Sequence, residues 1–138
     1  MVINMSFNFY TNDKINNSNM LLIYKVGIFY EVYNEDAYIL HYLTKYNIKK
    51  FKRYHRVGFP LSRLNSIIKL LDYNNIGYIV NDNLLNINNK IIDNKYFDIL
   101  GKSISFIDSE GLINMIIDKL SLMNRIDLEK LYIKNWYQ

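Results

Sequence analysis

The sequence predicts an α/β domain in which a mixed β-sheet is flanked by α-helices and closed by a C-terminal helical pair. Two strands are indicated by residues 21–33, where hydrophobic side chains lie on both sides of a break at Gly27. A helix is indicated by residues 64–71, whose leucines and isoleucines follow the i, i+3, i+4, i+7 pattern. Residues 78–80 read as a buried strand. A chain of 138 residues, half of them hydrophobic, suits one domain with a packed core.

The other elements of the N-terminal part are assigned from their local patterns. Residues 3–10 are expected to form a short strand or an ordered arm, and residues 34–45 a helix with one apolar face. Residues 48–54 alternate imperfectly and carry cations on both faces, which is typical of an edge strand. A loop is expected to follow this strand and to end at Pro60. Residues 81–94 read as hairpins or loops.

The C-terminal part is expected to contain two short strands and then the helical pair. The strands are assigned to residues 96–100 and 103–107, on either side of Gly101. Ser109 is expected to cap the first helix and Asp127 the second, since both residue types accept bonds from free backbone amides.

These assignments predict an α/β domain over residues 1–108 and a helical extension, residues 109–138, packed on the same domain. The extension has an apolar stripe at helical spacing, formed by Leu112, Ile113, Ile116, Ile117 and Leu120. The stripe is expected to be core. Alternatively, the same stripe, with Met115, Met123 and Trp136, could bind a helix of a partner protein.

Composition excludes several classes of site. The chain has no cysteine, which excludes disulfides and thiolate metal sites. His41 and His55 are its two histidines and are too few for a convincing zinc site, so no metal and no cofactor are expected. No apolar run approaches about 18 residues, so no membrane span is expected. The N-terminus lacks the layout of a signal peptide, and a cytoplasmic location is the expectation.

Positive charge is concentrated in one part of the chain. The net charge is +4, but no Asp or Glu occurs between Ala37 and Leu71. That window contains eight cationic residues: Lys45, Lys49, Lys50, Lys52, Arg53, Arg56, Arg63 and Lys69. The six from Lys45 to Arg56 are interleaved with aromatic residues, a pattern that indicates contact with phosphates. The alternative is a solvated face that aids solubility.

An aromatic ring and a carboxylate are placed two positions apart in the second strand. Side chains alternate between the faces of a strand, so Phe29 and Glu31 share one face and Tyr30 points to the other. A ring can stack on a nucleobase while a carboxylate bonds to its edge. The alternative is that Phe29 is a core residue and Glu31 a solvated strand residue.

Lys25 with residues 27–37, Gly58-Phe59-Pro60 with the helix that follows, and residues 77–80 form three blocks. Together these blocks resemble the first domain of the MutS DNA mismatch-repair proteins. That family usually shows a basic residue, an apolar residue, then G-D-F-Y-E and a later D-A. Lys25 and the residues 27–37 fit this pattern, except that Ile28 stands where the family usually has Asp. Gly58-Phe59-Pro60, a following helix, and residues 77–80 resemble the later blocks. The resemblance covers about residues 20–82 and implies that Phe29 wedges beside a mispaired base while Glu31 bonds to that base.

The protein is predicted to be a non-enzymatic nucleic-acid-binding module that acts as an accessory protein in a process like mismatch repair. DNA, including mismatched or distorted duplex, is the expected ligand, and structured RNA is a weaker option. The chain has no G-x-x-x-x-G-K-[ST] motif, so the ATPase of full-length MutS proteins is absent from it. The alternative function is a protein-interaction module or small accessory subunit of a larger nucleic-acid-processing assembly.

Overall fold

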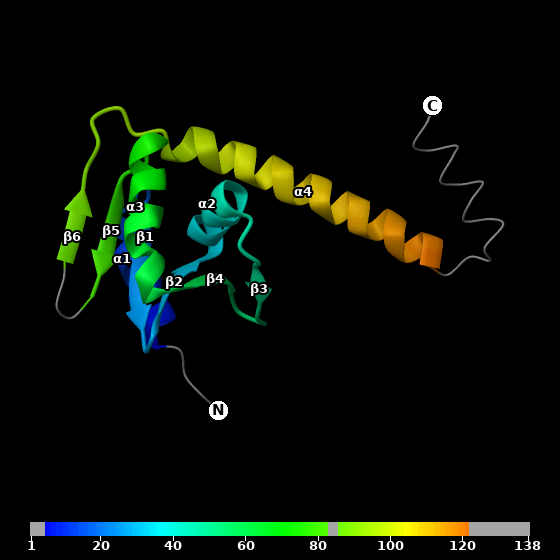
Figure 1. Cartoon of the computed structure of the whole chain (residues 1–138), viewed down its shortest axis with the longest axis horizontal. Coiled ribbons are helices and arrows are strands. Elements are labelled where there is room, and N and C mark those ends of the chain that lie inside the picture. Colours follow the sequence, from blue (N-terminus) through cyan, green and yellow to red (C-terminus); the bar gives the residue numbers. More distant parts are fainter. Residues whose placement is uncertain (1–4, 83–85, 122–138) are drawn as a thin grey trace. The chain divides into compact units, whose positions relative to one another are not determined.

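A mixed sheet of six strands forms the centre of the fold (Figure 1). The computed structural model describes residues 5–82 and 86–121. The chain divides into two compact units, residues 1–104 and 105–138, and the sheet lies within the first unit. The strands are β1 (Leu21–Val26), β2 (Phe29–Tyr33), β3 (Lys49–Lys50), β4 (His55–Pro60), β5 (Tyr78–Asn81) and β6 (Asn86–Asn89).

The strand order is β3-β4-β2-β1-β5-β6. Strands β3, β4, β2 and β1 pair antiparallel in turn, and β5 and β6 also form an antiparallel pair. The one parallel pair among the described strands joins β1 to β5. It requires a long crossover connection, which the intervening strands and helices from β2 to α3 supply. The α/β class with a mixed sheet, predicted from the sequence, is therefore confirmed.

One face of the sheet is covered by three helical segments. They belong to α2 (Asn34–Thr44), α3 (Leu64–Tyr73) and the first turns of α4 (Tyr96–Ser121). Alternate strand residues point to this side, and Ile23, Val32 and Val57 are fully buried there. A short 3₁₀ turn, Leu61–Arg63, leads from β4 into α3.

The opposite face is covered by α1 (Met5–Asn16), and its core is mostly aromatic. Its buried residues are Tyr10, Met20, Leu22, Tyr24 and Tyr33. Two of the tyrosine hydroxyls donate to carboxylates of helices: Tyr10 to Glu35 of α2 at 2.7 Å and Tyr24 to Asp13 of α1 at 2.6 Å. Burial and these carboxylates raise the pKa of both tyrosines, so both hydroxyls stay protonated and donate.

A buried ion pair ties α1 to α2. The Nζ atom of Lys14 lies 2.8 Å from the Oδ1 atom of Asp36, whose side chain is fully buried. Asp36 also accepts hydrogen bonds from the Tyr96 hydroxyl and the Leu22 backbone amide. Burial raises the pKa of Asp36 to about 6, although Lys14 and the two other donors act in the opposite direction.

The prediction of a strand or arm over residues 3–10 is wrong for its described part, because residues 5–16 form a helix. The sequence alternates Phe7 with Phe9 in the manner of a strand, yet Phe9 is 56% exposed. Phe7 and Tyr10 lie three residues apart and pack together on the tyrosine layer. Tertiary packing on that layer therefore selects the helical period over the strand period.

The predicted strands at residues 96–100 and 103–107 are also wrong, because α4 runs without interruption through both. Gly101 reads as a break but is exposed, and Ser103 is buried with its hydroxyl bonded to the Ile99 carbonyl at 2.7 Å. Tyr96, Ile99 and Ser103 therefore share one helical face. Ser109 lies inside this helix and caps no helix of its own.

A third correction concerns residues 55–60. The sequence predicts a loop there because of Gly58 and Pro60, but these residues form strand β4. Val57 and Phe59 alternate with them and are buried, and these buried side chains hold the segment against β2. The neighbouring strand β3 is reduced to two residues and lies at the edge of the sheet, as predicted.

The other N-terminal predictions are confirmed. Helices over about 34–45 and 64–71 and the strand at 78–80 are present, and residues 86–89 form the second strand of a hairpin with β5. The helix expected from Asp127 lies outside the described residues, as do the side chains of the predicted stripe. Within the described part of the chain, no helix is both long and apolar enough to cross a membrane.

Candidate nucleic-acid interface

Phe29 lies at the tip of the β1–β2 hairpin. The turn consists of Gly27 and Ile28, and Gly27 has a φ of 61°, in the left-handed region that favours glycine. Ile28 is 74% exposed and Phe29 is 45% exposed, whereas Tyr30 is buried in the core. Phe29 is thus accessible to a ligand, and the alternative in which it is a core residue is wrong.

Glu31 is held in place from two sides. Its side chain is 8% exposed, and its Oε2 atom lies 2.9 Å from the Nη1 atom of Arg56. Its Oε1 atom accepts a hydrogen bond of 2.8 Å from the Tyr33 hydroxyl. Glu31 is therefore not a solvated strand residue, which was the alternative drawn from the sequence.

Arg56 reaches Glu31 from the neighbouring strand. In the β2–β4 register Arg56 faces Tyr33 and Gly58 faces Glu31, so no side chain stands between the two charged groups. The guanidinium carbon of Arg56 lies 4.7 Å from the centre of the Phe51 ring, a cation–π contact. The charge of Arg56 is thus held between an acid and an aromatic face.

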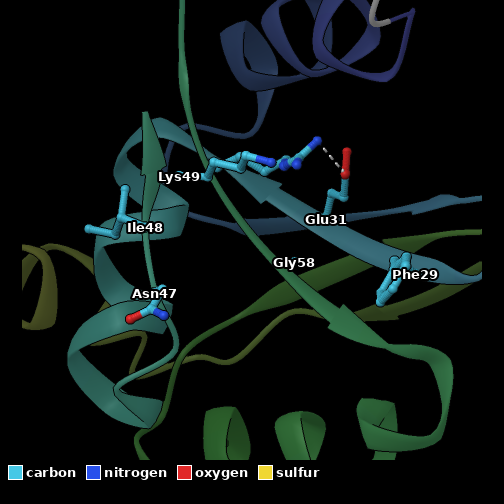
Figure 2. A pocket seen from close by; sticks show the side chains of 7 residues that line it. Phe29, Glu31, Asn47, Ile48, Lys49 and Gly58 are labelled. Carbon is cyan, nitrogen blue, oxygen red and sulfur yellow. Dashed lines mark ion pairs between the residues drawn. The ribbon is translucent and has the colours of Figure 1, made fainter. Parts of the chain in front are cut away.

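A surface hollow of about 380 Å³ opens beside this ion pair (Figure 2). Figure 2 shows Phe29 and Glu31 on one strand, with the ion pair of Glu31 marked by a dashed line. The hollow is lined by Phe29, Glu31, Asn47, Ile48, Lys49, Arg56 and Gly58. One aromatic ring, one acid, two cations and one amide therefore surround the same space.

The basic residues lie on and around the β3–β4 hairpin. Lys49, Lys50, Lys52 and Arg53 are exposed, and the turn is closed by a hydrogen bond of 2.9 Å from the Phe51 amide to the Tyr54 carbonyl. Because the hairpin lies at the sheet edge, its cations are presented outward.

Stacked aromatic rings connect this hairpin to α1. The Tyr54 ring stacks on Phe51 at 4.9 Å and on Phe7 of α1 at 4.5 Å between ring centres. The hairpin is therefore fixed to the aromatic layer, which limits the backbone entropy that the hairpin would lose on binding.

The structure brings four of the eight predicted residues to the hollow: Phe29, Glu31, Lys49 and Arg56. Lys52 and Arg53 line a neighbouring hollow with His55, whose Nδ1 atom lies 2.8 Å from the Tyr38 hydroxyl. Lys45 follows α2 with a φ of 65° and donates from Nζ to the Tyr42 carbonyl at 3.0 Å.

Three contributors to the hollow were missed from the sequence. Asn47 and Ile48 belong to a loop whose course is set by tertiary contacts, and no local pattern indicates it. Gly58 was not identified because its position opposite Glu31 depends on the β2–β4 register, which the sequence does not reveal. A Cβ at Gly58 would meet the Glu31 Cγ atom at 3.9 Å, an ordinary contact. No group of three or more possible metal-ligating residues occurs within residues 5–82 and 86–121.

The family model of MutS domain I matches residues 5–81. The chain belongs to the MutS domain I family. The matched range contains the β1–β2 hairpin, the β3–β4 hairpin and the helix α1, which the motif blocks alone did not reach. The resemblance seen in the sequence is thereby confirmed.

A second similarity is to the DNA-directed RNA polymerase subunit beta of Theileria parva. The two are 29% identical over 131 residues, which is 88% of this chain and 13% of that subunit. The chain thus spans about an eighth of the length of that relative. Identity at this level over so small a share assigns no activity to this MutS domain I.

Proposed function

We propose that this MutS domain I is a non-catalytic DNA-binding module that recognises mismatched or distorted duplex. In this proposal Phe29 wedges beside an unstacked base and Glu31 bonds to the edge of that base. The observation that carries the proposal is Phe29, a large aromatic residue left 45% exposed at a hairpin tip beside a charged hollow. Apolar wedges at such tips insert where base stacking is already weak.

The basic hairpin supplies the electrostatic part of the proposal. The exposed Lys49, Lys50, Lys52 and Arg53, together with Lys45 and Arg56, would contact phosphates on a mismatched duplex. Phosphate contacts fix the register of a protein on DNA, and base contacts supply the discrimination. The aromatic support under the hairpin favours this role over that of a mobile, solubilising charge cluster.

One observation favours the alternative of a protein-interaction module. Ile28, Phe29 and Leu61 are all exposed at the same end of the sheet, since Phe29 pairs with Pro60 in the β2–β4 register. Exposed apolar residues at one site can bind a protein partner. Such binding would depend weakly on salt, whereas phosphate binding depends on it steeply.

The test is the affinity of the full chain for matched duplex, duplex with one mismatch, single-stranded DNA and duplex RNA across a salt series. The proposal predicts binding that weakens steeply with salt and is tightest for the mismatched duplex. Equal affinity for matched and mismatched duplex would contradict recognition of mismatches. Tightest binding to RNA would change the ligand, and no binding to any nucleic acid would favour the protein-partner alternative.

A further inference from the structure

Glu31, the acid proposed to bond to a base, already has two partners in the protein alone. Glu31 gives one carboxylate oxygen to Arg56 and the other to the Tyr33 hydroxyl, and its side chain is 8% exposed. A base donor that approached through the hollow would have to compete with Arg56, because Tyr33 is fully buried whereas the side chain of Arg56 is 25% exposed.

When DNA is bound, a phosphate can replace Glu31 as the anionic partner of Arg56. Lys49 faces Arg56 directly in the β3–β4 register, so the pair of strands presents two cations side by side. In the free protein Glu31 balances one of them. A phosphate placed over this hairpin would offer Arg56 an alternative anion, and Arg binds phosphate with two parallel hydrogen bonds.

We propose that Arg56 is an exchangeable partner of Glu31 and thereby a specificity-determining residue; this inference rests on the proposed function. An N–H donor of an unstacked base in the hollow takes the place of Arg56 Nη1 at Glu31 Oε2. The released guanidinium pairs with a backbone phosphate. Each charge or donor keeps a partner, so neither Glu31 nor Arg56 is left as a buried, unpaired ion, which would be costly.

The exchange has a measurable consequence. A matched duplex offers no unstacked base, so Arg56 stays on Glu31 and makes no phosphate contact. A mismatched duplex releases Arg56 and gains one such contact. For B-DNA each neutralised phosphate adds about −0.9 to the slope of log affinity against log salt concentration. The slope for mismatched duplex should therefore be steeper than that for matched duplex by about 0.9.

Two variants should each abolish this difference between the two salt slopes, one by changing the slope for mismatched duplex and the other by changing the slope for matched duplex. Arg56→Met removes the cation and keeps an apolar stem, so the slope for mismatched duplex should fall to that for matched duplex. Glu31→Gln keeps an acceptor for Tyr33 but no longer holds Arg56, so the slope for matched duplex should rise to that for mismatched duplex. Lys52→Met is the control, because Lys52 is exposed in the adjacent turn and should lower both slopes equally.

The slopes are measured by fluorescence anisotropy on the full chain, with thermal unfolding recorded for each variant. Arg56→Met lowering both slopes equally would overturn the proposal, because Arg56 would then be an ordinary phosphate contact. Equal slopes for the two duplexes in the wild type would overturn the proposal as well. So would a Glu31→Gln variant whose slope for matched duplex is unchanged, and this second test does not require Arg56→Met to fold. A wild type that binds mismatched duplex more tightly, but with equal slopes, refutes the exchange and leaves the proposed function standing. Equal affinities refute the proposed function itself.

Discussion

At the scale of single residues, the Lys14–Asp36 pair shows the role of Asp36, the acid of the D-A motif at residues 36–37. Asp36 is fully buried and accepts bonds from Lys14, Tyr96 and the Leu22 amide, so it joins α1, α2, α4 and β1. None of its atoms faces the hollow described above. This acid is therefore structural, and its substitution should change stability before it changes binding.

We predict that Lys14→Met lowers the free energy of unfolding by about 3–5 kcal/mol at pH 8, because it leaves Asp36 as an unpaired buried charge. The pKa of Asp36 in the folded protein, about 6, lies above its ordinary value of 3.8. An acid raised in this way stabilises the fold at low pH, and that contribution is lost as the pH rises through the folded pKa. Without Lys14 the folded pKa rises further, so the variant should keep losing stability above pH 6.

The measurement is urea unfolding at pH 5 and pH 8. Lys69→Met is the control, because Lys69 is an exposed lysine of α3 and its loss should cost little at either pH. A cost of Lys14→Met that is equal at the two pH values would contradict an ionised Asp36 as the partner of Lys14.

Ile28 is the residue at which this chain departs from the usual family pattern. It is 74% exposed beside Phe29 at the hairpin tip. If the tip contacts DNA, Ile28→Asp should weaken duplex binding by on the order of 1 kcal/mol, since a carboxylate near phosphates is repelled. Ile92→Asp is the matched control, because Ile92 is also an exposed isoleucine in a turn and lies outside the proposed interface. Equal losses in the two variants would show that the tip does not contact DNA.

At the residue scale, the sequence predicted the position of Phe29 and Glu31 on one strand face but not the state of Glu31. The alternation of side chains is a local property and can be read directly from residues 29–33. The ion pair with Arg56 depends on the β2–β4 register, which joins residues 25 positions apart in the sequence and leaves no local signal. Burial of Glu31 was for that reason not foreseen.

At the scale of elements, helices and strands with a clean period were predicted and those with mixed signals were not. The 3.6-residue period of α3 is visible because one face of that helix is buried on the sheet. The alternating aromatic residues of α1 are typical of a strand, and Gly58 and Pro60 in β4 are typical of a loop, so both segments were predicted wrongly. Packing decided these segments, through the tyrosine layer for α1 and through Val57 and Phe59 for β4.

The β3–β4 hairpin carries the element-scale prediction. Replacing Lys49, Lys50, Lys52 and Arg53 with Ala should weaken DNA binding at low salt and lower the salt slope by up to about 0.9 for each cation in contact with a phosphate. The control replaces the same number of cationic residues elsewhere: Lys69, Lys90, Lys95 and Lys102. Fluorescence anisotropy across a salt series measures both variants. A slope that falls equally in both would indicate a general effect of net charge, with no interface at the hairpin.

At the scale of the whole molecule, the described core residues all lie within the first compact unit. The two buried clusters draw their members from residues 7–100, on both faces of one sheet. The first turns of α4 belong to this core, since Tyr96 and Ser103 are buried. Packing of residues 109–138 on the same domain stays a prediction.

We therefore expect a fragment of residues 1–104 to unfold cooperatively, because it contains the whole described core, and any stability that it loses relative to the full chain measures the predicted packing of residues 109–138. A fragment of residues 1–95 should be less stable by roughly 3–5 kcal/mol or more, because it loses the Tyr96 side chain from the core and a donor to Asp36. Circular dichroism during urea unfolding compares the two. Aggregation of the 1–104 fragment would instead support residues 109–138 as a cover for apolar surface of the sheet.

The central claim is that Phe29 reads distorted DNA, and Phe29→Ala tests it most directly. We predict a loss of about 1–3 kcal/mol in binding to mismatched duplex, a smaller loss for matched duplex, and a nearly unchanged melting temperature, because Phe29 is 45% exposed. Phe9→Ala, which removes another exposed phenylalanine, should change none of these values. Binding of Phe29→Ala to mismatched and matched duplex with wild-type affinity would contradict the claim. So would a large fall in melting temperature without a mismatch-selective loss, since Phe29 would then serve the fold.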